Sequence, residues 1–517
     1  MSFNGTLFLF GFLPITLALY YLLALTRLHA LRLPLLIVAT IGFYARSSAH
    51  YLPLLLGSVL INYLIGVAIA RSEKPIARLW LWLGVIANLT ILFWFKYAPA
   101  LSQGVSDAFG IDIRLAQMAL PLAISFYTFQ QIGHLVDLWR GRIAPPHALH
   151  YFAFILFFPQ LLSGPISLSR EMVPQLAERP VARRVPADLL FGLAIFAFGL
   201  FKKTVIADSF ALWTGPIFDA AAAGAHPSAA SAWGGALAYT LQIYFDFAGY
   251  SDMAIGVARM FGLLLPMNFF SPFRARSVVD LWRRWHITLG RFVQTYLFQP
   301  LAVPLARFAV DRDLGQRAAL IVATLAPTLL SMLIIGVWHG ASWTFVLFGA
   351  MHGTYMMTNE AWADFKRRHK MRKDADHPAW RRIVATLATT LAFVLASVPF
   401  RSPDLGTAGR MFGGMIGLNG GPGVWEAWPV LVPLGAWGLY PLLIAGFLFV
   451  YLLPNTQQIM DKAVPALEWA KWRKMDTPPI AFAWQPTASW CLAIGAILMV
   501  GIAFIARGTT NFVYFGF

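Results

Sequence analysis

The sequence predicts an all-α protein that crosses a membrane many times. Three observations predict this fold class: 58% of the 517 residues are hydrophobic, only 12% are charged, and apolar runs of membrane-spanning length recur along the chain. Soluble domains contain about 25% charged residues, so a water-soluble fold is excluded, and the hydrophobicity also excludes intrinsic disorder. Cys491 is the single cysteine, which excludes internal disulfides and cysteine-based zinc sites.

The first span is expected at residues 7–25. Residues 1–6 carry no basic residue, whereas a secretory signal has a basic start, so this run is interpreted as an uncleaved helix. Arg27 and Arg32 follow it. Because basic residues mark the cytoplasmic side of a membrane protein, the N-terminus is predicted to lie outside.

Further spans follow from runs of suitable length, since a helix needs about 20 apolar residues to cross the bilayer core. Together with the first, these runs predict about 11–13 spans; they lie at 33–45, 51–70, 79–98, 117–135, 187–206, 231–248, 318–338, 342–360, 383–400, 431–453 and 487–507. The run 33–45 is short and is expected to be tilted or partial. Two other apolar stretches, 151–165 and 292–306, are short and broken by Gly or Pro, which predicts re-entrant or in-plane segments.

The basic residues test this map. With the N-terminus outside, 32 of the 40 Lys and Arg fall in the predicted cytoplasmic segments, as the positive-inside rule requires, and the C-terminus also falls outside. Most of the net charge of +17 is therefore a topology signal, and a nucleic-acid partner is not expected.

Four polar clusters lie in or beside the spans, where ionisable side chains are costly and often functional. They contain Asp246, Tyr250 and Asp252 (245–252, FDFAGYSD), Arg283, Arg284, Trp285 and His286 (280–286, DLWRRWH), Trp338 and His339 (336–340, GVWHG), and His352 (349–353, GAMHG). The glycines beside His339 and His352 would let another backbone or a substrate come close.

Each cluster also has a structural interpretation. Asp246 and Asp252 would form ion pairs with Lys202 or Arg259, the arginines would mark topology, and the histidines would be packed core residues. Three histidines at this spacing fit no metal motif, so no metal site is expected. A neutral imidazole in a dry cavity is suited to act as the general base for a hydroxyl that attacks an acyl group. The sequence contains neither a G-x-S-x-G elbow nor a Walker motif.

Six segments, in order, carry a resemblance to a known family. They are LPLAISFYTFQQIGHLVDLWRG (120–141), FFPQLLSGPI (157–166), YFDFAGYSDMAIG (244–256), NFFSPF (268–273), DLWRRWHITL (280–289) and GVWHGASW (336–343). Together they resemble the membrane-bound O-acyltransferase (MBOAT) family, in particular its bacterial branch that O-acetylates exopolysaccharides such as alginate. The resemblance covers 1–517 as a single membrane domain, with a motif-bearing catalytic core at 120–360 and an aromatic tail at 508–517.

The resemblance implies a helical bundle with re-entrant segments around a central tunnel. His339 matches the catalytic histidine of the family and His286 its second signature position. Tunnel lining or support is the role expected of the other matching or neighbouring residues: Asp246, Tyr250, Asp252, Arg283, Arg284, Trp285, Trp338 and His352.

The resemblance also implies a reaction. An acyl group, expected to be acetyl from acetyl-CoA, would pass from the cytoplasm to a hydroxyl outside, with no bound cofactor. Arg274, Arg276, Arg283 and Arg284 would meet the donor phosphates, and His286 or Trp285 would orient or stabilise the acyl oxygen. The implied location is the bacterial inner membrane with both termini in the periplasm, and the implied partners are lipids and a polysaccharide or a periplasmic SGNH-type acetyltransferase.

The last residues, NFVYFGF, resemble an F-x-Y-F-x-F ending of this branch. In the branch that D-alanylates teichoic acids a similar tail belongs to a small partner whose tyrosine is thought to carry the acyl group. Tyr514 is therefore a candidate acyl relay. The alternative is an aromatic anchor at the outer membrane interface.

The segment FVQTYLFQPLAV (292–303) departs from the family pattern, with Gln294-Thr295 in place of Arg-Asp and Ala302-Val303 in place of Gly-Gly. This departure leaves the donor-side contacts and the polysaccharide open. Two other functions remain as alternatives: a polytopic transporter whose ionisable groups relay protons, and an acyltransferase for lipids or sterols. The first usually has internal symmetry, which is not seen here, and the aromatic tail argues against the second.

Overall fold

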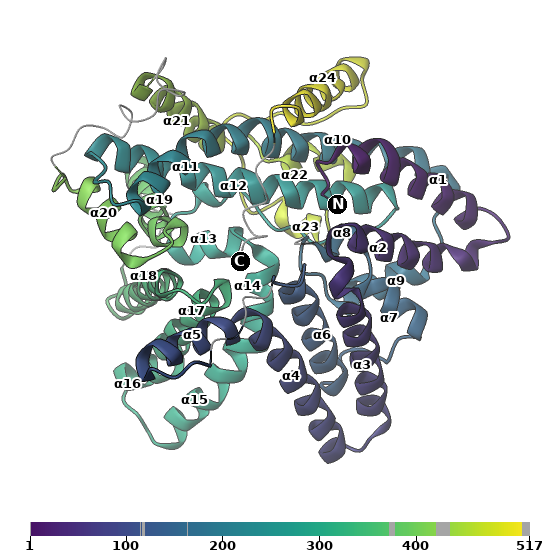
Figure 1. The fold of residues 1–517 in the computed structure, drawn as a ribbon, viewed down its shortest axis with the longest axis horizontal. Helices are drawn as coiled ribbons and strands as arrows, with labels where there is room; N and C mark the ends of the chain where they lie inside the picture. The colour runs from purple at the N-terminus through teal and green to yellow at the C-terminus, as the bar shows by residue number, and fades with distance from the viewer. Residues whose placement is uncertain are drawn as a thin grey trace.

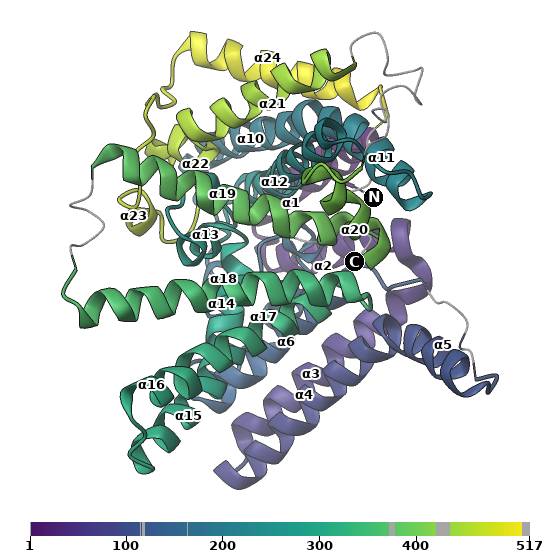
Figure 2. The ribbon, with the colours of Figure 1, turned by 90° about the vertical axis from the view of Figure 1, so that its left-hand side faces the viewer.

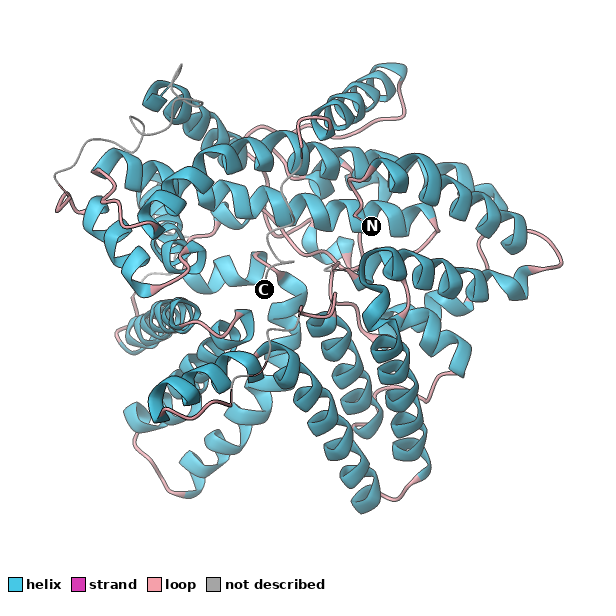
Figure 3. Ribbon diagram, in the orientation of Figure 1, coloured by secondary structure: helices cyan, strands magenta, loops and turns pink. Residues whose placement is uncertain are grey.

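The computed structural model describes residues 2–113, 115, 119–162, 164–371, 378–419 and 435–508. Every regular element among these residues is helical, which confirms the all-α fold class (Figure 3). Six helical stretches of the described residues are long and apolar enough to cross a membrane: His29–Arg71, Lys74–Lys96, Ala182–Ala222, Gln316–His339, Ala379–Arg401 and Ala488–Ile505. The chain is thus a multi-pass membrane protein, and the count of about 11–13 spans stays a prediction.

Several helices of the N-terminal part begin at prolines. Its elements are η1 (Phe8–Phe12), α1 (Leu13–Ala24), η2 (His29–Leu31), α2 (Arg32–Ser48), η3 (Ala49–Tyr51), α3 (Leu52–Arg71), α4 (Lys74–Lys96), α5 (Ala98–Phe109) and α6 (Ile124–Trp139). Proline occupies the first turn of α1, α3, α4 and α5, where its missing N–H leaves no helical bond unmade.

A buried polar cluster joins α3, α4 and α6. Gln131 accepts hydrogen bonds from Ser58 and Asn62, and Asn88 donates to Asn62 at 2.7 Å. In hydrocarbon such side chains have no water to bond, so they fix the three helices against one another.

The middle of the chain supplies the core of the bundle. It contains α7 (Ala148–Ile155), α8 (Phe158–Leu161), α9 (Ser169–Ala177), η4 (Ala182–Arg184), α10 (Val185–Phe201), η5 (Lys202–Ala207), α11 (Asp208–Ala222) and α12 (Ala229–Met260). The 32-residue α12 is buried along most of its length. Figures 1 and 2 show it crossing the centre, with α10, α21 and α24 layered on one side and α13, α14, α17 and α18 on the other.

Two pairs of glycines bring α10 and α12 together. A Cβ on Gly192 would lie 2.5 Å from the carbonyl oxygen of Gly256, and one on Gly199 would lie 2.6 Å from that of Gly249. Larger residues would hold the backbones apart, as in other membrane helix pairs that use small residues. The helices are therefore in direct backbone contact.

The remaining elements surround this core. They are η6 (Pro272–Arg274), α13 (Val278–Arg284), α14 (Ile287–Val293), η7 (Gln294–Phe298), α15 (Gln299–Asp311), α16 (Gln316–Leu320), η8 (Ile321–Leu325), α17 (Ala326–His339), α18 (Trp343–Arg368), α19 (Ala379–Arg401), α20 (Leu405–Met415), α21 (Gly435–Leu452), α22 (Thr456–Ile459), η11 (Asp461–Ala463), α23 (Trp469–Trp472) and α24 (Ala488–Ile505).

The two expected broken segments differ. Residues 151–162 form the end of α7 and the short α8 with an irregular break at Leu156 and Phe157, as an interrupted segment requires. The break expected in 292–306 is not found, because α14, η7 and α15 follow one another without interruption; a re-entrant or in-plane position for this segment stays a prediction. Pro300 follows the π-helical turn η7 and lies in the first turn of α15, where the i→i−4 bond is already displaced and its missing N–H costs little.

Candidate active site

His339 is the last residue of α17, and its side chain is buried. Gly340 follows with an extended backbone that turns the chain toward α18. The imidazole packs edge-on against the rings of Phe348, at 5.7 Å between centroids, and Phe400, at 4.8 Å. The end of a helix and two aromatic side chains thus hold this histidine in an apolar setting.

His286 lies between α13 and α14 in the left-handed backbone conformation, with φ +42°. Asn268 fixes this turn: its backbone carbonyl accepts from Ile287 N–H at 2.9 Å, and its side-chain oxygen accepts from the Thr288 hydroxyl at 2.7 Å. The same oxygen lies 3.1 Å from His286 Nδ1. Since a carbonyl oxygen only accepts, Nδ1 carries the proton and Nε2 carries the lone pair.

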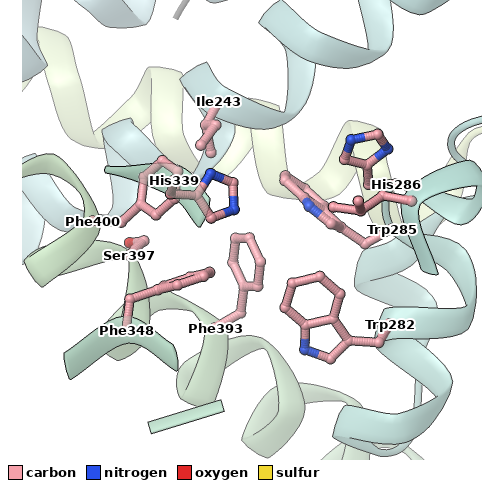
Figure 4. A pocket seen from close by; sticks show the side chains of 10 residues that line it. Ile243, Trp282, Trp285, His286, His339, Phe348, Phe393, Ser397 and Phe400 are labelled. Carbon is pink, nitrogen blue, oxygen red and sulfur yellow. The ribbon is translucent and has the colours of Figure 1, made fainter. Parts of the chain in front are cut away.

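The two histidines line one small pocket. The other lining residues are Ile243, Trp282, Trp285, Leu289, Phe348, Phe393, Ser397 and Phe400 (Figure 4). The space open to the centre of a water molecule is about 10 Å³, roughly what a single water occupies. Motifs from α12, the α13–α14 turn, α17, α18 and α19 therefore converge on one site with room for one small group.

This arrangement suits proton transfer during acyl transfer. A neutral imidazole lone pair can take a proton from a hydroxyl, the Trp285 indole N–H can donate to a developing oxyanion, and the rings limit the water that would hydrolyse an acyl donor. Among the described residues, no group of three or more His, Cys, Asp or Glu lies close enough to bind a metal ion.

Comparison with known proteins assigns the family. Residues 140–398 match the membrane-bound O-acyltransferase family. The chain is 38% identical to the peptidoglycan O-acetyltransferase of Helicobacter pylori over 447 residues, which are 81% of this chain and 80% of the relative. It is 34% identical to the probable alginate O-acetylase AlgI of Pseudomonas aeruginosa, over 82% of this chain and 76% of the relative. The chain belongs to the membrane-bound O-acyltransferase family.

A third relative of this O-acyltransferase is less similar in sequence. The teichoic acid D-alanyltransferase of Bacillus subtilis is 29% identical over 272 residues, which are 52% of this chain and 65% of the relative. Membership of the family makes the chain an acyltransferase, so the transporter alternative is set aside.

His352 and Trp338 lie behind the pocket of the O-acyltransferase and do not line it. Trp282 donates its indole N–H to His352 Nδ1 at 3.3 Å, and the His352 ring packs on Phe348 at 4.7 Å. Trp338 packs against His339 at 4.7 Å and against Phe129 at 5.4 Å. Both residues back the rings that form the wall, which fits support more closely than lining.

Asp246 and Asp252 form buried ion pairs in this O-acyltransferase. Lys202 Nζ lies 2.7 Å from Asp252 Oδ2, and Lys203 Nζ lies 2.7 Å from Asp246 Oδ1. The expected partner Lys202 is therefore found, whereas Arg259, the other expected partner, pairs with Asp188 instead at 3.0 Å.

The π-helical turn η5 carries both lysines toward α12. Asp252 also accepts from Thr456 at 2.7 Å and from Gln457 at 2.6 Å. Tyr250 is buried and stacks on Phe3 at 5.0 Å. These groups lie outside the histidine pocket and hold α10, α12 and α22 together.

The arginines divide into two kinds. Arg274 and Arg284 both pair with Asp476, at 3.3 and 3.4 Å, and Arg284 also pairs with Asp280 at 2.9 Å. Arg276 and Arg283 are exposed. The expectation that all four meet donor phosphates therefore narrows to the two exposed side chains, because the other two are already neutralised.

Sequence reasoning missed Lys96 and Tyr97. Lys96 donates to the backbone carbonyl of Trp338 and lies over its ring, 5.3 Å from the centroid, while the Tyr97 hydroxyl donates to the carbonyl of Val337 at 2.9 Å. Both hydrogen bonds reach carbonyls of the last turn of α17, where the Val337 carbonyl also accepts from the Gly340 N–H at 3.1 Å. A lysine within an apolar run was the available signal. Tyr514 lies outside the described residues.

Proposed function

We propose that this chain transfers an acetyl group from cytoplasmic acetyl-CoA to a hydroxyl on the outer side of the membrane, for O-acetylation of a cell-wall glycan or an exported polysaccharide. The names of its relatives, which act on peptidoglycan or alginate, support this acceptor class. A lipid or sterol acceptor has no such support. The observation that carries the proposal is the convergence of His339 and His286 on one small, apolar pocket.

In the proposed reaction His339 is the general base. It takes the proton from the acceptor hydroxyl, whose oxygen forms a bond to the acetyl carbonyl carbon. The carbon–sulfur bond of the thioester then breaks, and the coenzyme A sulfur leaves with the proton held by His339. His286 is assigned to orient the acyl group beside the reacting atoms, because its ring lines the same pocket and its Nδ1 is held by Asn268.

Trp285 is assigned to the acyl oxygen. Its ring lines the pocket and packs against Phe393 at 4.7 Å and Phe269 at 5.1 Å. Neutral His286 with its proton on Nδ1 has no donor at Nε2, so the indole N–H of Trp285 is the better source of a hydrogen bond to the oxyanion.

The donor is proposed to dock where Arg276 and Arg283 are exposed. Guanidinium groups bind phosphates with paired hydrogen bonds. Arg283 lies on α13 beside Trp282, which lines the pocket, and Arg276 lies just before this helix. The inner-membrane location, the periplasmic termini and a periplasmic SGNH-type acetyltransferase as the next acceptor belong to the same proposal. Tyr514 is the proposed relay in that case.

Membrane vesicles containing the chain and radiolabelled acetyl-CoA test the proposal. Coenzyme A release and label in glycan fragments are measured for the wild type, His339→Ala and His226→Ala; His226 is an exposed loop histidine and serves as the control. We expect His339→Ala to abolish both signals and His226→Ala to keep them. Retention of transfer by a well-expressed His339→Ala protein would refute the assignment.

A further inference from the structure

A second cavity lies apart from the histidine pocket. It has a volume of about 220 Å³, some twenty times that of the histidine pocket, and its walls come from α10, η5, α12, α21, α22 and α24. Most of its lining is Phe, Ile, Val and Leu. The proposed acetyl transfer leaves it unused.

One end of this cavity is polar. Lys202 and Thr456 both line it and are joined to each other at 2.7 Å, and Asn455 donates to Ser271, another lining residue, at 2.9 Å. Lys202 follows the end of α10, Asn455 and Thr456 follow the end of α21, and Ser271 lies just before η6. The cavity is therefore amphipathic, with a hydrogen-bonding end and a long apolar end.

The apolar end adjoins the lipid-facing surface. Figures 1 and 2 show α21 and α24 at the outer edge of the bundle, over α10. The surfaces of these helices are apolar and exposed, as at Ile444, Leu448 and Leu492, the last with 74% of its surface exposed. In a membrane these side chains contact hydrocarbon, so whatever enters between α21 and α24 comes from the bilayer.

We propose that this cavity binds one hydrocarbon chain of a membrane phospholipid. The chain would lie among Phe198, Phe245 and Ile497, and the ester end of the lipid would meet the Lys202–Thr456 pair. Apolar lining, a polar end and continuity with the lipid-facing surface together match a lipid chain and no water-soluble ligand.

The bound chain would also support the reaction site. Tyr244 lines the cavity, and its ring lies 6.1 Å from that of Trp285, which lines the histidine pocket. The occupied cavity would hold Tyr244 against Trp285. This proposal does not depend on the identity of the acyl donor or the glycan, because it concerns binding alone.

Photolabelling tests the site. The purified full-length chain is placed in nanodiscs that contain a phosphatidylethanolamine with a diazirine on one acyl chain, and the labelled residues are found by mass spectrometry. We expect label on Tyr244 and Val450, which are only 5% and 7% exposed, so lipids that merely surround the protein do not reach them.

The matched variants lie on α24. Ile497→Trp fills the cavity and should abolish label on Tyr244 and Val450, whereas Leu492→Trp, on the exposed face of the same helix, should leave it unchanged. Ile206→Phe fills the cavity from η5 and replaces Ile497→Trp if that variant fails to fold. Absence of label on the two buried residues, or the same label in a folded cavity-filling variant, overturns the proposal.

Discussion

The contact between α17 and α18 predicts a large effect for a single added methyl group. A Cβ on Gly349 would lie 2.5 Å from the carbonyl oxygen of Met332, and one on Gly336 would lie 2.3 Å from that of Phe345. Both obstacles are backbone atoms and cannot rotate away. Gly349→Ala must therefore push the two helices apart.

The size of the effect follows from these distances. Ordinary contact starts at 3.4 Å, so the helices must separate locally by about 1 Å. Overpacking of this kind costs about 1–3 kcal/mol, against a gain of about 0.5–1 kcal/mol from replacing glycine in a helix. His339 ends α17 and packs on Phe348 of α18, and a displacement of about 1 Å in a catalytic group can lower the rate by about 100-fold.

Gly290→Ala is the matched control. Gly290 lies in α14, four residues after His286, and its added Cβ would meet only the Trp282 carbonyl oxygen, at 3.6 Å. Coenzyme A release and thermal unfolding are measured for both variants. We expect a severe loss of rate with modest destabilisation for Gly349→Ala and near wild-type behaviour for Gly290→Ala. Wild-type transfer by Gly349→Ala, or equal losses in the two variants, would show that the close contact between α17 and α18 does not position His339.

Four further predictions test other contacts. Lys96→Met should lower the rate of coenzyme A release strongly and the unfolding temperature only slightly, because Lys96 holds the end of α17. Lys96→Arg should restore part of the rate. Equal rates for the two variants would contradict this role. Asp252→Asn leaves Lys202 buried with less compensation and should cost about 3–5 kcal/mol in unfolding free energy, and the double variant with Lys202→Met should recover stability in the same thermal assay. Arg283→Ala should raise the KM for acetyl-CoA with little change in kcat. A change in kcat alone would show that Arg283 does not bind the donor. Tyr514→Phe should stop O-acetylation in cells. Full acetylation by this variant would show that Tyr514 is not an acyl relay.

Much of the candidate site could be predicted because its residues carry local signals. His339 and His286 each stand in a short, distinctive motif, and an ionisable group in an apolar run is expensive enough to be noticed. The ion pair between Asp252 and Lys202 could also be predicted from the sequence, since both are charged residues in neighbouring spans.

Other features depend on geometry that the sequence does not display. Lys203 faces Asp246 because a π-helical turn changes the phase of the helix after Phe201, and a turn of this kind has no residue signature. Lys96 meets Trp338 across 242 positions, so only the approach of the C-terminal ends of α4 and α17 brings them together. The continuous helix at 292–306 escaped prediction because a proline such as Pro300 usually marks a break, and here it follows the π-helical turn η7, which accommodates it.

The volume of the histidine pocket also bears on hydrolysis of the acyl donor by water. A space that holds one water molecule does not reject water by size, since water is smaller than any acceptor that carries a hydroxyl. His339, Trp285 and Ser397, which line the same space, can hydrogen-bond to such a water molecule. The hydroxyl of a larger acceptor, anchored by contacts elsewhere, would take over these partners and displace the water. Protection of acetyl-CoA from hydrolysis would then depend on strong binding of the acceptor, and the rate of thioester hydrolysis without acceptor measures how far water replaces it.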